Sequence, residues 1–224
     1  MGWRPQNHTG RTWRTLSEVT KALAEIAVAE AGPYLSAKAK QVEATTEQLT
    51  TDLNTAHSHS VTFNSLDSGT QYAYRVGDGT NWSEWFHFRT ASARDAPFSF
   101  IYFGDAQNSI RSLWSCVIRE AYRDAPKAAF LLHAGDLVNI AESDGEGGQW
   151  FGAGAWLNAM MPNMAVPGNH EQVRDEEDNY RLSHHWRPQF SFPQNGPVGL
   201  AESCDTLVYQ NMRLIGLDSN RQQK

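Results

Sequence analysis

The chain has 224 residues, 40% hydrophobic and 20% charged, with a formal net charge of −6. This length allows one large or two small domains with a sizeable core, and the lack of any Lys/Arg block argues against a protein that tracks a nucleic-acid backbone. No apolar run reaches the roughly 18 residues needed to cross a bilayer, and the first residues show no apolar segment of a secretory signal. The two cysteines are far apart and fit neither a metal knuckle nor a redox pair.

Residues 16 to 50 give conflicting signals. The stretch LSEVTKALAEIAVAEAG, which begins at Leu16, has helical propensity and apolar residues at a loose helical spacing. A β-sandwich of the size indicated by the following residues needs strands in this part of the chain. The secondary structure of this segment therefore stays open.

Three segments between residues 59 and 90 alternate apolar and polar side chains, which is typical of half-buried strands. In HSVTF (59–63) the alternation places Val61 and Phe63 on one face, and QYAYRV (71–76) and EWFHFRT (84–90) alternate in the same way. Turn-forming residues separate the three segments. We therefore predict two consecutive antiparallel hairpins within a β-sandwich.

A short polar linker, ASARDAP (91–97), follows the sandwich pattern. After it, FSFIYFGD (98–105) and AAFLLHAGD (128–136) are nearly continuous apolar runs, typical of strands buried on both faces. NMAVPGNHE (163–171) is predicted to be the third strand and its exit.

Helices are predicted between these strands. SIRSLWSCVIREAYRD (109–124) carries one apolar helical face, formed by Ile110, Leu113, Trp114, Val117 and Ala121. A Gly-rich loop, GEGGQWFGAG (145–154), is predicted to precede a helix around Ala155 to Met160. Alternating strands and helices imply parallel strands joined by right-handed crossovers.

Each of the three predicted strands ends in glycine followed by a side chain that can bind metal. These strand ends are Gly104-Asp105, Gly135-Asp136 and Gly168-Asn169-His170. In a parallel sheet, ligands bind outside the carboxyl ends of the strands, so Asp105, Asp136 and Asn169 are expected to converge. Two carboxylates and an amide oxygen brought together repel or go unsatisfied unless a cation lies between them. The pattern therefore predicts a shared metal site.

The order GDAQ, GDLVN, GNHE resembles the calcineurin-like metallophosphoesterases. The segments WRT (13–15), HSVTF and YAYRVGDGTNWSEWFHFRT are similar to the fibronectin-III-like domain that precedes the catalytic domain in purple-acid-phosphatase-type enzymes. The resemblance runs from about Trp13 to Asn220. It implies a fibronectin-III-like sandwich over residues 1–92 and an α/β metallophosphoesterase domain, an α/β/β/α sandwich with parallel βαβ units, over residues 97–224.

The resemblance also implies a dinuclear metal centre (Fe, Zn or Mn) that activates water to hydrolyse a phosphate-ester substrate. Asp105 would bind the first metal, Asp136 would bridge both, and Asn169 would bind the second. His170 would stabilise or protonate the leaving oxygen rather than ligate. The resemblance suggests a secreted or periplasmic location, although no signal peptide is visible, and neither a nucleic-acid nor a membrane partner is expected.

Two positions depart from the family pattern. The purple enzymes carry a tyrosine three residues after the bridging aspartate, where this chain has Asn139. Tyrosine-to-iron charge transfer would therefore be absent, so a colourless protein is expected. Gln107 takes the place of a Gly or His in many relatives, and its amide either coordinates metal weakly, lies beside the ligands or belongs to the surface. Asn139 is likewise a candidate to bind metal or to lie beside the ligands.

The remaining ligands of the family are histidines, one isolated and two in a GHxH motif, and none of the eight histidines here has such a context. Without them the surviving donors are hard oxygens, which suit weakly bound Mg or Mn better than Zn or Fe. The catalytic domain is therefore expected to be incomplete in this chain. The adjacent pair His184-His185 is not expected to replace the missing ligands, and His133 is interpreted as a core residue. The alternative function is a binding or structural fragment with a vestigial metal site.

Overall fold

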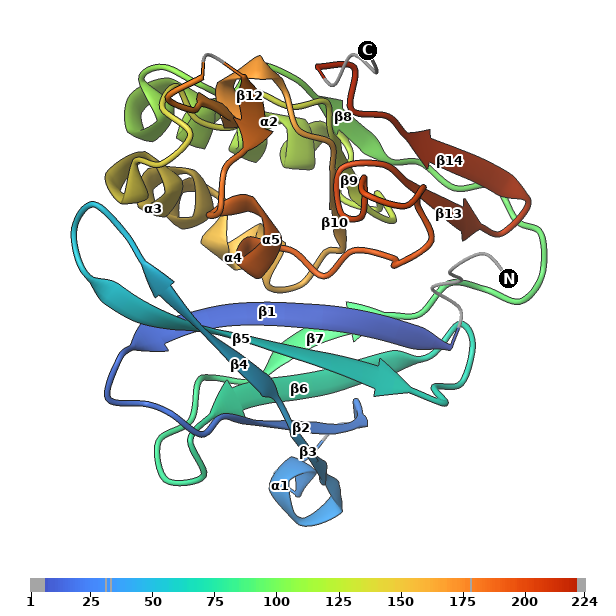
Figure 1. The fold of residues 1–224 in the computed structure, drawn as a ribbon. Coiled ribbons are helices and arrows are strands. Elements are labelled where there is room, and N and C mark those ends of the chain that lie inside the picture. The colour runs from blue at the N-terminus through green and yellow to red at the C-terminus, as the bar shows by residue number, and fades with distance from the viewer. Residues whose placement is uncertain (1–6, 31, 33, 178, 221–224) are drawn as a thin grey trace.

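The computed structural model describes residues 7–30, 32, 34–177 and 179–220. A β-sandwich forms one layer and an α/β region is stacked on it (Figure 1). The sandwich comprises β1 (His8–Leu16), β2 (Leu23–Val28), α1 (Leu35–Lys38), β3 (Lys40–Glu43), β4 (Thr45–Thr50), β5 (Thr55–Asn64), β6 (Gln71–Gly77) and β7 (Phe86–Arg89).

The α/β region follows the linker and contains short strands and helices. Its elements in order are β8 (Ile101–Phe103), the π-helix η1 (Ile110–Trp114), α2 (Ser115–Asp124), β9 (Leu131–His133), α3 (Asp144–Ala153), α4 (Ala155–Asn158), β10 (Asn163–Ala165), the 3-10 helix η2 (Asn169–Glu171), β11 (Gln172–Arg174), β12 (Tyr180–Leu182), α5 (Trp186–Gln189), β13 (Asp205–Tyr209) and β14 (Met212–Gly216). Among the described residues, no helix is long and apolar enough to cross a membrane.

The sandwich consists of two antiparallel sheets, with strand orders β1-β5-β4 and β3-β2-β6-β7. Aromatic side chains from both sheets fill the space between them. The ring of Phe63 lies 6.1 Å from that of Tyr74 and is stacked 6.4 Å from that of Phe88. Val61 and Phe63 are 4% and 2% exposed, so the alternation predicted for this strand is confirmed.

Strands, rather than a long helix, form about half of residues 16 to 50, despite the helical propensity of this segment. Among its described residues only Leu35–Lys38 are helical. The strand β2 lies between β3 and β6, and its Ala24 is opposite Val42 on one side and Val76 on the other. Hydrogen bonds to two neighbouring strands and burial of the apolar side chains outweigh a propensity of a few tenths of a kcal/mol per residue.

One of the two predicted hairpins is wrong. β6 and β7 do form an antiparallel hairpin, but β5 pairs with β1 and β4 and not with β6. The turn between β5 and β6, with Ser65 and Gly69 at positive φ, carries the chain from one sheet to the other. Alternation predicts a half-buried strand but does not distinguish a neighbour in the same sheet from one in the facing sheet.

The α/β region is organised around a parallel sheet with strand order β10-β9-β8. Ile101, Leu131 and Asn163 are in register across it. The three predicted parallel strands are therefore confirmed. Burial on both faces is wrong for β8, because Tyr102 is 63% exposed while its neighbours Ile101 and Phe103 are buried.

The helix predicted over 109–124 is present, but it begins with a π-helical turn. Ile110, Trp114 and Ile118 are buried, whereas Leu113 and Val117 are 63% and 51% exposed. A π-turn holds more residues than an α-turn, so the positions that follow it are rotated relative to a regular helix. The predicted face is therefore confirmed at Ile110 and Trp114 and wrong at Leu113 and Val117.

The segment predicted as a Gly-rich loop is the helix α3. Its N-terminal turn is capped by the Ser143 hydroxyl, which accepts a hydrogen bond from the Glu146 amide at 3.4 Å. Trp150 of α3 is 2% exposed and belongs to the core of the α/β region. Burial of aromatic side chains offsets the unfavourable helix propensity of glycine. The helix predicted around Ala155 is α4.

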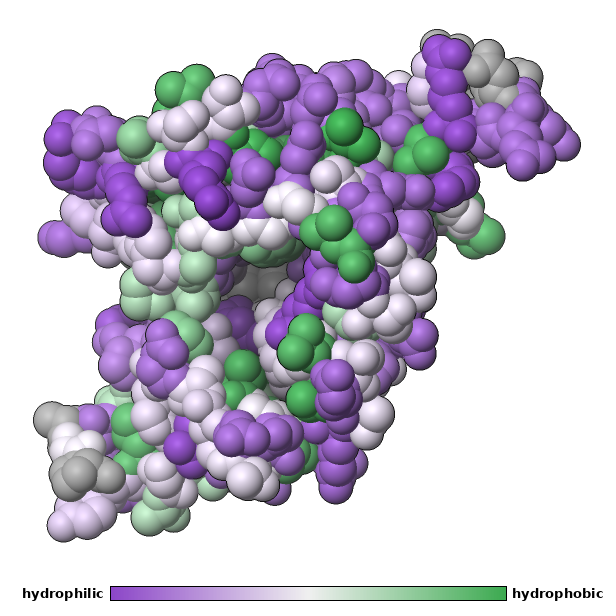
Figure 2. All heavy atoms as spheres, turned by 90° about the vertical axis from the view of Figure 1, so that its left-hand side faces the viewer, coloured by the Kyte–Doolittle hydropathy of each residue, from purple (hydrophilic) through white to green (hydrophobic). Residues whose placement is uncertain are grey.

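Polar contacts join the sandwich to the α/β region. The Tyr74 hydroxyl donates to the Ala159 carbonyl at 2.6 Å, and the Thr12 hydroxyl donates to the Gln189 carbonyl at 2.8 Å. Arg14 forms a salt bridge with Asp144. A hollow remains between the two layers (Figure 2).

Candidate metal centre

The polar residues that follow the three parallel strands lie at one edge of the sheet. Strands β8, β9 and β10 run parallel and in register and end at Phe103, His133 and Ala165. Asp105, Asp136 and Asn169 come shortly after these ends. The parallel topology therefore carries all three loops to the carboxyl edge of the sheet.

Asp105 and Asp136 share an uncommon backbone conformation. Both have φ of +53°, in the left-handed region that few residues other than glycine adopt. Such conformations cost about 1–3 kcal/mol each and persist only where surrounding contacts hold them. The chain therefore turns sharply two residues after the end of β8 and three residues after the end of β9.

The side chain of Gln107 connects the two carboxylates. Its amide nitrogen lies 3.2 Å from Asp105 Oδ1 and 3.5 Å from Asp136 Oδ2. The backbone amide of Gln107 donates to the Asp136 carbonyl at 3.0 Å. Both carboxylates thus face one point, where the structure places a positively polarised group.

The chemistry of these donors fits an oxygen-ligated cation. The amide oxygen of Gln107 is buried and has no hydrogen-bond partner, and rotation of the amide by half a turn would direct it between the carboxylates. Two carboxylates and an amide oxygen form a donor set suited to Mg²⁺ or Mn²⁺. In the described part of the chain, no three His, Cys, Asp or Glu side chains come together in an arrangement that could hold a metal, so a site here depends on amide donors as well as carboxylates.

The loop after β10 faces the loop after β9. The backbone amide of His170 donates to Asp136 Oδ1 at 2.9 Å, and His170 Nδ1 lies 2.7 Å from the Asn139 carbonyl oxygen. A carbonyl only accepts, so Nδ1 carries the proton and Nε2 remains available. Asn169 is exposed, and with His170 and Asn139 it lines a cavity of about 770 Å³.

Close packing between these loops requires glycine at two positions. A Cβ on Gly168 would lie 2.1 Å from Asp136 Oδ1, and one on Gly135 would lie 2.4 Å from the Gly168 amide nitrogen. Gly135 also has φ of +87°. The glycines before Asp136 and Asn169 are therefore needed for the approach of the two loops as well as for the turn.

Sequence reasoning assigned no role to Glu171, which the structure places directly behind the cluster. It is 4% exposed, and its carboxylate accepts hydrogen bonds from three backbone amides, those of Asp136, Leu137 and Gly168. Burial raises the pKa of Glu171 and these hydrogen bonds lower it, with a net shift upward. The only sign in the sequence was the position of this carboxylate, immediately after Asn169 and His170.

The other histidines considered from the sequence lie outside this cluster. His133 is 1% exposed, with Nε2 at 3.1 Å from Asn163 Oδ1, and burial lowers its pKa to about 4. It is a neutral core residue, which confirms its interpretation from the sequence. His184 interacts with Glu142 and the Thr50 carbonyl, and His185 is buried.

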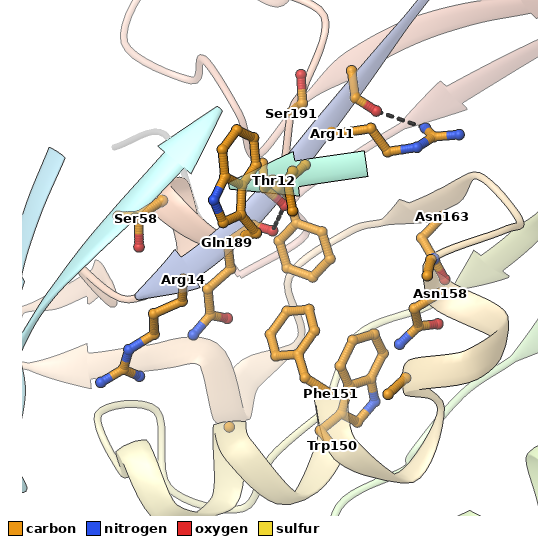
Figure 3. Close-up of a pocket in the computed structure, with 18 of the residues that line it drawn as sticks. Arg11, Thr12, Arg14, Ser58, Trp150, Phe151, Asn158, Asn163, Gln189 and Ser191 are labelled. Atoms are coloured by element: carbon orange, nitrogen blue, oxygen red, sulfur yellow. Dashed lines mark hydrogen bonds between the residues drawn. The ribbon is translucent and has the colours of Figure 1, made fainter. Parts of the chain in front are cut away.

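A second cavity, of about 430 Å³, lies between the sandwich and the α/β region. Trp150 and Phe151 point into it from α3, opposite the strand that carries Thr12 (Figure 3). None of the predicted site residues lines this cavity. It belongs to the contact between the two layers and not to the strand-end cluster.

Family models match both parts of the chain. Residues 98–222 match the model of the calcineurin-like phosphoesterases, and residues 3–90 match that of the purple acid phosphatase N-terminal domain. The acid phosphatase type 7 proteins of Mus musculus and Homo sapiens are 32% and 31% identical to this chain over 143 residues. Each match covers 60% of this chain and 30% of the relative, so the matched part is less than a third of these relatives' length.

Solved structures share the fold. A purple acid phosphatase from yellow lupin (Lupinus luteus) seeds superposes with a TM-score of 0.72 and 16% identity, covering 97% of this chain and 44% of the lupin chain. The structure of PhoD gives a TM-score of 0.64 and 11% identity, covering 96% of this chain and 50% of that chain. The arrangement of a β-sandwich followed by an α/β region is thus that of known structures.

Proposed function

The chain belongs to the calcineurin-like phosphoesterases, and we propose that its strand-end cluster is a metal-dependent site for hydrolysis of phosphate esters. The observation that carries this proposal is the convergence of Asp105 and Asp136 on the amide of Gln107. A scaffold has no need of two carboxylates facing one point in strained backbone conformations. Their position at the carboxyl edge of a parallel sheet is where such folds bind ligands.

The metal ions would be held by Asp105, Asp136 and Asn169, with Asp136 as a ligand of both ions. Gln107 could add its amide oxygen. Bound metal would supply charge that stabilises the phosphoryl oxygens and acidifies a water molecule. The chain's own contribution is to fix the donors. His170 restrains Asp136 through its backbone amide, so the carboxylate does not rotate freely.

His170 is proposed to protonate the leaving oxygen. Its Nδ1 proton is committed to the Asn139 carbonyl at 2.7 Å, so Nε2 is the atom that can reach a substrate. His170 therefore donates a proton only in the imidazolium form, when Nε2 is also protonated. The cavity it lines with Asn169, about 770 Å³, has room for an ester and its leaving group.

The proposal is tested by assaying an aryl phosphate with the chain in Mn²⁺, Mg²⁺ and Zn²⁺. We expect turnover that depends on metal and falls at least about 100-fold in Asp105→Asn, because replacing a carboxylate ligand by a neutral amide weakens the site by about 3 kcal/mol. The matched control is Asp95→Asn, at an exposed position in the linker, which should retain activity. Absence of both turnover and Mn²⁺ binding in the wild-type chain would contradict the proposal and favour a binding module with a vestigial site.

The role of His170 is tested by varying the leaving group. An alkyl phosphate needs its leaving oxygen protonated, whereas a nitrophenyl phosphate does not. His170→Ala should therefore slow alkyl ester hydrolysis by about 10²–10⁴-fold and nitrophenyl ester hydrolysis much less. Equal losses on both esters would show that His170 acts in another way.

The colour of the metal-loaded protein tests the role of Asn139. With no tyrosine at this position, the iron-loaded chain should show no charge-transfer band in the visible range. A purple protein would require a tyrosine ligand from elsewhere in the chain.

A further inference from the structure

Glu171 is buried against the backbone of the two loops that form the cluster. Its Oε2 accepts hydrogen bonds from the amides of Asp136 at 2.9 Å and Gly168 at 2.7 Å, and its Oε1 accepts one from the amide of Leu137 at 2.8 Å. All three distances lie within the ordinary range of N–H···O hydrogen bonds. One carboxylate thus joins the loop after β9 to the loop after β10.

The three amides need an acceptor that the rest of the fold does not supply. Asp136 lies in the left-handed region, so its amide does not continue the backbone hydrogen-bonding pattern of β9. Gly135 and Gly168 approach so closely that even one added Cβ would clash, and a carboxylate satisfies the N–H groups of both loops together. Buried amides without a partner would destabilise this conformation.

His170, in the loop after β10, also donates hydrogen bonds to the loop after β9. The His170 amide donates to Asp136 Oδ1, and the His170 ring contacts the Asn139 carbonyl. Glu171 belongs to the same 3-10 helix as Asn169 and His170. A change in the position of the Glu171 carboxylate would therefore be transmitted to Asp136 through its backbone and to Asn169 through the helix.

We propose that Glu171 is a positioning residue for the metal centre: its carboxylate sets the backbone of the two loops so that Asp136 and Asn169 face a common cation. The identity of these two ligands rests on the proposed function. Glu171 itself reaches the backbone and not the cation, so its effect on metal binding is indirect. Residues that orient metal ligands typically change affinity by 10–100-fold when they are replaced.

The test compares Glu171→Gln and Glu171→Ala with Leu157→Ala. Glutamine keeps the shape of the side chain but presents an NH₂ group to backbone N–H donors. Leu157, in α4, is 1% exposed in the core of the α/β region, so its truncation lowers stability without removing a side-chain hydrogen bond to the loops. Mn²⁺ affinity is measured on folded protein from the electron paramagnetic resonance signal of free Mn²⁺, and backbone amide hydrogen exchange is measured without metal.

Both Glu171 variants should bind Mn²⁺ about 10–100-fold more weakly than the wild type, and Leu157→Ala within about threefold of it. The amides of Asp136, Leu137 and Gly168 should exchange at least about tenfold faster in the Glu171 variants, while those of β9 keep their rates. An aspartate at this position, Glu171→Asp, keeps the charge and should recover part of the affinity.

Unchanged amide exchange in the Glu171 variants would overturn the inference, as would unchanged Mn²⁺ affinity. An equal loss of affinity in Leu157→Ala would also overturn it, because the effect would then follow from stability alone. If the wild-type chain binds no Mn²⁺, the proposed function fails separately. Faster metal-free exchange confined to the two loops in the Glu171 variants would then still support the action of Glu171 on their backbone.

Discussion

The sandwich and the carboxyl edge of the parallel sheet are stabilised in different ways. In the sandwich, side chains such as Phe63 and Phe88 are buried in regular strands with ordinary backbone angles, and apolar packing holds them. At the sheet edge, two aspartates adopt left-handed backbone conformations and face each other across an amide. No described residue of β5 or β7, the strands that carry these two rings, has a positive φ, whereas the sheet edge has two aspartates that do.

This difference shows where the fold accepts unfavourable local structure. Departures from local preference are expected at functional sites and need compensation elsewhere. Here the compensation includes the carboxylate of Glu171 and the backbone amide of His170. Substitutions in the sandwich should therefore change stability and leave metal binding intact, and substitutions at the edge should do the reverse.

The largest effect is expected in the sandwich core. Phe63→Ala removes a ring that is 2% exposed, and such truncations cost about 3–5 kcal/mol. Urea unfolding measures the loss, and Mn²⁺ titration of the remaining folded protein should give the wild-type affinity. A parallel fall in affinity would mean that the sandwich and the strand-end cluster are coupled.

Asp136→Asn should have the opposite signature. Loss of a ligand charge should lower Mn²⁺ affinity at least about 100-fold, equivalent to about 3 kcal/mol. The free energy of unfolding without metal should stay the same or rise, because asparagine adopts the left-handed conformation readily and one of two facing charges is removed. Marked destabilisation of the metal-free variant would show that Asp136 is chiefly a structural residue.

Acid should destabilise the α/β region through His133. Its pKa is about 4 in the folded chain, below the ordinary value of about 6.5, so the unfolded chain binds the extra proton first as pH falls. The free energy of unfolding should therefore drop by about 3 kcal/mol between pH 6.5 and pH 4. His133→Phe should lack this pH-dependent loss of stability. Measuring the free energy of unfolding of both proteins across this pH range tests the prediction.

The smallest effect is expected at the exposed salt bridge between the two layers. Arg187 Nη2 lies 2.8 Å from Glu47 Oε2, and their side chains are 59% and 47% exposed. Pairs of this kind contribute about 0–1 kcal/mol. A double-mutant cycle with Arg187→Ala and Glu47→Ala should give a coupling energy in this range, and a larger value would indicate that the contact between the layers depends on this pair.

The three parallel strands of the α/β region could be predicted because they are apolar runs that end in Gly-Asp or Gly-Asn. The pairing of β5 could not, since alternation is the same for neighbours within a sheet and across a sandwich. The buried face of α2 was mispredicted because a π-turn leaves no clear mark in the order of residues. The helix α3 was predicted as a loop because of its glycines, since the burial of Trp150, which stabilises the helix, is visible only in the tertiary structure.

The sequence by itself determined which chemical groups follow the strands, since Asp105, Asp136, Asn169 and His170 are set by their spacing from apolar runs. Only the tertiary structure decided how these groups meet. The amide of Gln107 between two carboxylates and the carboxylate of Glu171 beneath three backbone amides join segments about 30 residues apart. The physical reason is that hydrogen bonds and left-handed turns at the sheet edge depend on how closely the loops approach, and parallel strand pairing, not local sequence, sets that distance.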